Sequence, residues 1–203
     1  VTETKEVTVH VTTPALSHNG TPTDPLDAKT AILMAGQLDG PSKEMSEFAY
    51  FVKGTITDDP TADYCNFHFK DGDKDIIIYG LWAANGKDRY GSKREIPELP
   101  VKKGDEVALY AKLQNFNGTL ELANAILLSV NGEDTGAKIT LSAREAVLIA
   151  GELDPETKEK TENAYYFEVT ITDDPTADYC NFHFKSGETE VLVYGLYAEN
   201  GTD

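Results

Sequence analysis

An internal repeat constrains this chain more than any other feature of its sequence. The segment ITDDPTADYCNFHFK stands at 56–70 and recurs letter for letter at 171–185, an offset of 115 residues. The offset holds beyond this block, because AILMAGQLD at 31–39 matches AVLIAGELD at 146–154. A period this long indicates two tandem domains and not a solenoid of short units.

The repeat predicts four parts along the chain. They are an N-terminal extended segment (1–24) with one candidate strand at 5–13, a first copy (25–130, "copy one"), a polar linker (131–138) and a second copy (139–203, "copy two"). Residue 203 matches Asp88, so copy two is expected to hold only the first three strands of the module.

Composition narrows the function classes. The net charge of −17 opposes binding to a phosphate backbone, which requires clustered lysine and arginine, so nucleic acid is an unlikely partner. No apolar run approaches eighteen residues, and we therefore expect no membrane insertion. An apolar fraction of 40% is ordinary for a globular protein.

Each copy is predicted to begin with a short helix. In copy two, Ser142 and Glu145 have the spacing of a capping box, and in copy one Asp27 takes the cap position. Apolar residues at helical spacing follow each cap, so one helix face is expected to pack on the rest of the module.

Alternating and apolar stretches predict five strands in copy one, at 50–56, 64–70, 76–82, 106–113 and 119–130. An Asp-Gly pair separates the second strand from the third, and an Asn-Gly pair separates the fourth from the fifth. The long connection between the third and fourth strands carries no convincing helix pattern.

Four segments of copy one together carry a family resemblance. They are YFVKGTIT at 50–57, the Tyr-x-Asn-Phe strand with its Asp-Gly turn at 64–72, the YGLW strand at 79–82, and VKKGDEVALYAKLQNFNGTLEL at 101–122. The chain resembles OB-fold modules of secreted and surface proteins from gut-type bacteria. Cys65 and Cys180 depart from that pattern, because a small glycine usually follows the tyrosine.

The resemblance implies an all-β fold of tandem five-stranded OB-fold barrels, each preceded by a short capping helix, with the second copy lacking its last hairpin. It also implies an extracellular or cell-surface location. OB barrels bind ligands across strands two and three, between the first and last hairpin loops. Carried onto this chain, that face comprises Tyr64, Asn66, His68, Lys70, Trp82, Asn115 and Phe116, with Tyr179, Asn181, His183, Lys185 and Tyr197 in copy two.

Aromatic side chains in this set suit sugar faces or bases, and Asn and His supply orienting hydrogen bonds. The alternative is that these side chains only cover an outer sheet face.

The acid-rich loop that both copies share is a candidate calcium site. Its carboxylates are Asp58, Asp59 and Asp63, with Asp173, Asp174 and Asp178 in copy two. The competing interpretation is Asp-Pro turn chemistry on a solvated surface, since no EF-hand spacing is met. No other cofactor is expected.

Nothing in the sequence points to catalysis. Zinc and redox spacings, phosphate loops and nucleophile elbows are missing, so we expect that the protein is not an enzyme. Cys65 and Cys180 are interpreted as small buried hydrophobic residues.

Three functions stay open at this point. The first is a non-catalytic extracellular module that binds or adheres to carbohydrate or protein, as part of a larger surface protein. The second is a structural subunit of a surface filament or layer assembled by strand complementation, which would make a homopolymer through the 5–13 strand. The third is binding of single-stranded nucleic acid.

A three-stranded fragment leaves an open edge, so something is expected to complete copy two. The missing strands belong to a longer protein, or the strand at 7–13 inserts into copy two of the same chain or of a neighbouring chain.

Overall fold

The computed structural model describes residues 18–153, 156–157, 160–161 and 164–195. Within them lie two helices and ten strands, and the prediction of a largely β fold is confirmed. The candidate strand at 5–13 lies outside the described residues. Neither described helix has the length and apolar character needed to cross a membrane.

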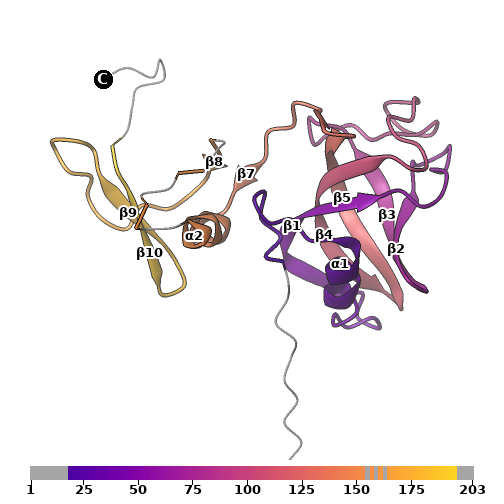
Figure 1. Cartoon of the computed structure of the whole chain (residues 1–203), viewed down its shortest axis with the longest axis horizontal. Helices are drawn as coiled ribbons and strands as arrows, with labels where there is room; N and C mark the ends of the chain where they lie inside the picture. Colours follow the sequence, from indigo (N-terminus) through magenta and orange to yellow (C-terminus); the bar gives the residue numbers. More distant parts are fainter. Residues whose placement is uncertain (1–17, 154–155, 158–159, 162–163, 196–203) are drawn as a thin grey trace, which may run out of the picture.

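Copy one supplies five strands of a six-stranded sheet (Figure 1). Its strands are β1 (Met45–Thr55), β2 (Phe67–Asp71), β3 (Lys74–Trp82), β4 (Glu106–Phe116) and β5 (Thr119–Val130). The spatial order is β1-β4-β5-β3-β2. All neighbours are antiparallel except β3 and β5, which run parallel, so the last hairpin is inserted between the first strand and the β2–β3 pair.

The two predicted tight turns are present. Asn117 and Gly118 both have positive φ, at 54° and 94°, as a two-residue turn that follows the twist of its strands requires. Gly72 has a φ of 60° between β2 and β3. Local sequence therefore determines both hairpins.

The sheet does not close into a barrel in the part of the chain that the structure describes. β1 and β2 form its two edges and share no strand ladder. One residue bridges them just past the end of β1, where the Thr57 N–H donates to the His68 carbonyl at 3.0 Å. Copy one therefore has an open sheet in place of the expected closed five-stranded barrel, and a backbone hydrogen bond joins the ends of its two edge strands.

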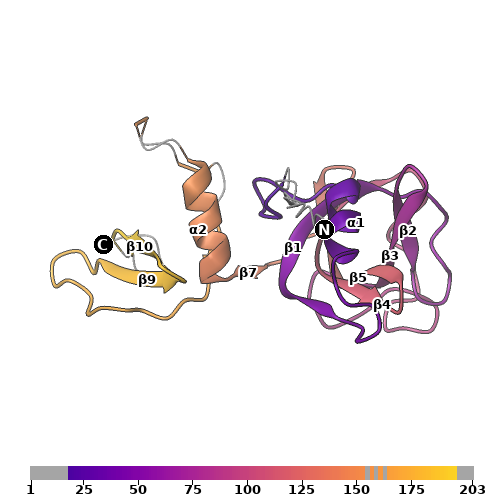
Figure 2. The same cartoon turned by 90° about the horizontal axis from the view of Figure 1, so that it is seen from below.

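Helix α1 (Ala28–Ala35) covers the interior of this sheet and contacts all five strands (Figure 2). Asp27 caps it as predicted, because its side chain accepts from the Thr30 N–H at 2.7 Å. The buried face of α1, with Ala31 and Ile32, joins the apolar core that the strands supply.

The predicted linker is partly structured. β6 (Glu133–Asp134) turns back and pairs with the end of β5, and Thr135 caps the same strand through the Leu127 carbonyl. β7 (Thr140–Leu141) then pairs in parallel with β8 (Tyr166–Phe167). The chain thus passes from one copy to the other through short paired segments.

Copy two keeps only part of the module. Its helix α2 (Ala143–Glu152) has the predicted capping box between Ser142 and Glu145, and its hairpin consists of β9 (Phe182–Ser186) and β10 (Thr189–Val193). In the first-strand region of copy two, the structure has the two-residue strand β8 among the described residues. β8 pairs with β7, and Ile171 forms an isolated antiparallel bridge with Phe184 of β9.

Side chains in the first turn of helix α2, which lies on the β1 side of copy one (Figure 1), contact β1 and β4. The Arg144 guanidinium lies over the Phe48 ring at 4.9 Å, and the Tyr110 hydroxyl donates to Glu145 at 3.3 Å. Burial raises the pKa of the Tyr110 hydroxyl, and the nearby Glu145 carboxylate raises it further.

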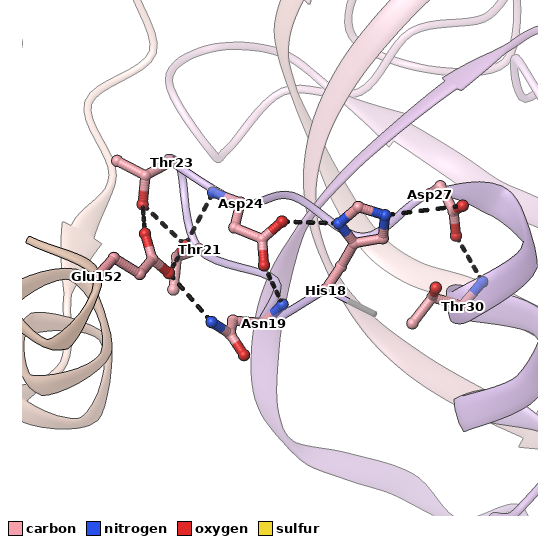
Figure 3. A network of polar contacts seen from close by, with 8 residues as sticks. All are labelled: His18, Asn19, Thr21, Thr23, Asp24, Asp27, Thr30 and Glu152. Carbon is pink, nitrogen blue, oxygen red and sulfur yellow. Dashed lines mark hydrogen bonds and ion pairs between the residues drawn. The ribbon is translucent and has the colours of Figure 1, made fainter. Parts of the chain in front are cut away.

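The far end of α2 is held by the segment that precedes α1 (Figure 3). The Glu152 carboxylate accepts hydrogen bonds from the side chains of Asn19, Thr21 and Thr23. His18 and Asp24 brace the same segment, with His18 Nδ1 2.7 Å from Asp24 Oδ1. Helix α2 is therefore held by copy one at its first turn and by the N-terminal segment at its last.

One packing difference separates the first strands of the two copies. Gly54 on β1 lies directly under the Phe69 ring, and a Cβ atom at Gly54 would be 2.7 Å from the nearest ring carbon. The repeat places Val169 at the corresponding position of copy two. The absence of a side chain at Gly54 therefore lets β1 approach the Phe69 ring in copy one, and Val169 lacks this feature in copy two.

Gly54→Val, which introduces the residue of copy two, is expected to destabilise copy one by about 1–3 kcal/mol through overpacking against Phe69. Urea unfolding followed by the fluorescence of Trp82, the single tryptophan, measures this change within copy one. Val169→Gly is the matched control and should leave the Trp82 transition unchanged. An unaltered transition in Gly54→Val would contradict the packing argument.

Candidate ligand-binding groove

A groove of about 310 Å³ opens on the outer face of copy one, and we call it the aromatic groove. Four aromatic side chains supply its walls, from the loop after β1, from β3 and from the end of β4. Its lining residues are Met45, Tyr64, Asn66, Tyr79, Gly80, Trp82, Arg89, Arg94, Gln114, Phe116, Glu121, Ala123 and Asn124. Tyr79 is 59% exposed, so its ring is open to a ligand.

Cationic side chains stack on three of these rings. Arg94 lies 4.6 Å from the Tyr64 centroid, Arg89 lies 5.0 Å from the Trp82 centroid, and Lys43 lies 4.5 Å from the Phe116 centroid. Such contacts fix the orientation of exposed rings and place positive charge at the rim of the groove. The groove is thus locally cationic in a strongly acidic chain.

The loop at 57–66 is held against the sheet by its own polar side chains. The Asn66 side-chain oxygen accepts from the Gly80 N–H on β3 at 2.8 Å, and the Thr61 hydroxyl accepts from the Asn66 N–H at 3.0 Å. Asp58 accepts from the His68 N–H at 2.8 Å, and its other oxygen lies 2.8 Å from His68 Nδ1. These bonds fix the position of Tyr64 at the edge of the groove.

Copy two repeats this loop bond for bond. Asn181 accepts from the Gly195 N–H at 2.8 Å, Thr176 accepts from the Asn181 N–H at 3.0 Å, and Asp173 holds His183 through both contacts. The identical sequence therefore gives an identical local structure, although the surrounding sheet differs. We call this set of bonds the loop clasp.

The connection between β3 and β4 carries the two arginines and is pinned to the same loop. The Ser92 N–H donates to the Ala62 carbonyl at 2.8 Å, and Lys93 pairs with Asp63 at 2.7 Å. Gly91 has a φ of 127° and lies so close to the Asp63 backbone that a side chain would clash. Pinning of this segment directs Arg89 and Arg94 into the groove.

A buried carboxylate is among the groove-lining residues. Glu121 on β5 is 8% exposed, and burial raises the pKa of its carboxyl group. The aspartates of the loop at 57–66 do not line the groove.

The structure gathers four of the seven residues predicted in copy one. Tyr64, Asn66, Trp82 and Phe116 line the groove, and Tyr79 joins them. The other three predicted residues, His68, Lys70 and Asn115, do not line it.

Their positions explain why. His68 is engaged by Asp58, and Lys70 is exposed near the end of β2. Asn115 is buried and ties the β4–β5 turn to the segment that follows α1, since its amide donates to the Leu38 carbonyl and its oxygen accepts from the Gly118 N–H.

The residues predicted for the ligand face of copy two make other contacts. Tyr179 stacks on Tyr194 with centroids 6.3 Å apart, and Lys185 pairs with Glu190 at 3.3 Å. His183 and Asn181 serve in the loop clasp. Tyr197 lies outside the described residues.

The acidic loop does not gather its carboxylates. Asp58 and Asp173 are bonded to histidines, and Asp63 is bonded to Ser92 and Lys93, which hold the pKa of its carboxyl below the usual range. Asp59, Asp174 and Asp178 are exposed. Within the described ranges no three His, Cys, Asp or Glu side chains form a group able to hold a metal.

Arg89, Arg94 and Glu121 escaped prediction from the sequence. A signal for the arginines was present, because KDRYGSKR at 87–94 concentrates four cations in an acidic chain. Glu121 occupies an alternating strand like any other outward-facing residue, and only the tertiary fold buries it.

The backbone conformation at the two cysteines is one that glycine usually adopts. Cys65 and Cys180 both have a φ of 53°, the left-handed region in which glycine is the usual residue. Burial raises the pKa of the Cys65 thiol to about 12, in keeping with its interpretation as a buried apolar residue. Cys180 is half-buried.

Comparison with protein-family models gives no match, and comparison with curated protein sequences gives no significant relative.

Glu121→Gln is expected to raise the stability of copy one at pH 7. The folded-state pKa of Glu121 is raised, so the stability that its neutral form contributes at low pH is lost as the pH rises through that pKa. Glutamine is neutral throughout, and the difference in midpoint should vanish below about pH 4, where glutamate is protonated in both states. Urea midpoints from pH 3 to 8 measure it, with the exposed Glu106→Gln as control. Equal midpoints for Glu121→Gln and the original chain at pH 7 would refute the claim.

His183 is expected to titrate above the ordinary histidine pKa, because the hydrogen bond to Asp173 raises the pKa of its ring. The stabilisation by this pair is complete below about pH 6.5 and is lost as the pH rises through the folded-state pKa. NMR titration of the ring protons measures the shift, and Asp173→Asn should return the pKa to about 6.5. Asp174→Asn, one residue along, should change it far less. A pKa unmoved by Asp173→Asn rules out the pairing.

Proposed function

We propose that copy one is an OB-type module that binds a carbohydrate ligand in the aromatic groove without acting on it chemically. The observation that carries this proposal is the convergence of Tyr64, Tyr79, Trp82 and Phe116 on one groove together with two arginines. Aromatic faces pack on the apolar faces of sugar rings, and guanidinium groups donate to hydroxyl or carboxylate oxygens.

The OB interpretation is supported by chain order. β1 is followed by the β2–β3 hairpin, a long connection and the β4–β5 hairpin, which is the order that the resemblance implies. The Thr57–His68 bond between the two sheet edges is compatible with a partly open barrel. The groove lies between the loop at 57–66 and the end of β4, where barrels of this class bind ligands.

The size and chemistry of the groove support a sugar-sized ligand. A volume of about 310 Å³ is at the lower end of the range for small-ligand sites. Gln114 and Asn124 add amide groups to the lining, which can orient ring hydroxyls. Short oligosaccharides fit this mixture of exposed rings and fixed polar groups better than a large flat protein surface does.

The number of carboxylates in the groove lining supports binding without catalysis. Hydrolysis of a glycosidic bond ordinarily uses two carboxyl groups on either side of the bond. Glu121 is the one acidic side chain among the groove-lining residues that the structure describes, and it is buried. We therefore propose a module that retains its ligand, outside the cell or at its surface as the resemblance implies, within a larger surface protein.

Single-stranded nucleic acid is a second candidate, and one observation favours it. Arg89 and Arg94 stack on rings at the groove rim, and a combination of cations and aromatic platforms is typical of such binders. The net charge of −17 and the buried Glu121 oppose it. Assembly into a filament rests on the segment at 5–13, which lies outside the described residues, and no described contact supports it.

Trp82→Ala and Tyr79→Ala are each expected to weaken carbohydrate binding by about tenfold or more, since loss of a ring-stacking contact costs on the order of 1–2 kcal/mol. A glycan array followed by calorimetry on retained glycans measures this. Tyr166→Ala removes an equally exposed ring outside the groove and should bind as the original chain does.

Circular dichroism on each variant separates lost binding from lost folding. Retained glycan binding in both folded groove variants would contradict the proposal. Gel shifts with oligo-dT at low salt test the second candidate, and binding there that falls steeply with added salt would replace the carbohydrate proposal.

A further inference from the structure

Copy two exposes apolar side chains that copy one buries at the same positions of the repeat. Ile56 is 1% exposed, whereas its counterpart Ile171 is 47% exposed. Val52 is fully buried, whereas its counterpart Phe167 is 41% exposed. Because the sequence of the two copies is so similar here, the difference lies in what covers these residues.

The exposed positions adjoin an apolar cavity of about 350 Å³ between α2 and the β9–β10 hairpin. Ile149 of α2 and Leu153 just after it lie on one side, and Phe184, Val191 and Val193 of the hairpin lie on another. Tyr165 and Phe167 also line the cavity. We call this the open face of copy two.

In copy one the corresponding residues are covered by the β4–β5 hairpin. Leu109 of β4 is paired with Val52 of β1, and Leu122 of β5 is paired with Ile78 of β3, the counterpart of Val193. All four of these side chains are buried. The hairpin thus both covers the core and supplies the strand partners of β1 and β3.

We propose that the open face of copy two is the docking surface of a β-hairpin with the residue pattern of β4–β5. The second strand of that hairpin would pair in parallel with β10, as β5 pairs with β3. Its first strand would pair antiparallel with residues 164–171, as β4 pairs with β1. β10 has β9 as its sole strand partner among the described residues, which leaves an edge for this pairing.

The proposal commits to a hairpin that follows β10 in the same polypeptide, at the distance at which β4–β5 follow β3. Copy one shows that a connection of the length of 83–105 reaches from one position to the other. A tethered hairpin also docks at a high effective concentration, which a separate chain does not have. The repeat therefore specifies the occupant in both sequence and order.

The test extends the chain after Asp203 with a copy of residues 89–130. The extended chain is expected to lose most of the fluorescence enhancement that the original chain gives with 8-anilinonaphthalene-1-sulfonate, an apolar-surface probe, because the open face becomes covered. Amide exchange in β9 and β10 should slow by at least about tenfold, which corresponds to about 1.4 kcal/mol of added protection.

The matched control carries the same extension with serine at the appended counterparts of Leu109, Leu113, Leu122 and Leu127, all buried in copy one. This control should leave dye binding and amide exchange at the values of the original chain. Unchanged exchange in the extended chain, or equal slowing in the serine control, would overturn the proposal.

Other occupants give different results. If the original chain binds little dye and deletion of residues 1–13 raises the binding, the N-terminal segment occupies the face and the proposal is wrong. If sedimentation shows that the original chain self-associates and the extension does not change this, a second copy covers the face and the proposal is again wrong. None of these measurements involves the aromatic groove, so they stand apart from the carbohydrate proposal.

Discussion

The sheet of copy one depends on the position of one hairpin. β1 has its ladder with β4, and β3 has its ladder with β5, so the β4–β5 hairpin is the connection through which β1 and the β2–β3 pair belong to one sheet. The same hairpin buries the leucines that fill the interior beneath α1. The aromatic groove depends on it as well, since Phe116 and Glu121 belong to these strands and Trp82 belongs to the strand paired with β5.

Comparison of the two copies separates local from non-local causes of structure. The loop clasp is the same in both, down to the left-handed cysteine and the histidine held by aspartate, because every partner lies within fourteen residues of the other. The first strand is not the same, because its partner in copy one is more than fifty residues away along the chain. Hydrogen bonds between residues close in the chain form in both copies, whereas β1 has 11 residues and β8 has 2.

This distinction also explains how much could be predicted from the sequence. The capped helices and the Asp-Gly and Asn-Gly hairpins follow from residues close together, and the structure has them where the sequence indicates. The parallel pairing of β3 with β5 has no local signal, because it joins strands across a long connection. Only part of the groove could be predicted, because some of its residues are placed by contacts between distant segments. Tyr64 and Trp82 could be proposed from their strands, whereas Arg89 and Arg94 reach the groove only because their segment is pinned to a distant loop.

The left-handed cysteines have a practical consequence for following this protein in solution. Two thiols sit in the same backbone conformation, yet one is sealed in a core and the other is within reach of solvent. An alkylating reagent therefore discriminates between two copies that most spectroscopic methods would average. The rate at which Cys65 becomes modified reports how often the first module opens, and Cys180 offers an attachment point for a dye on the second.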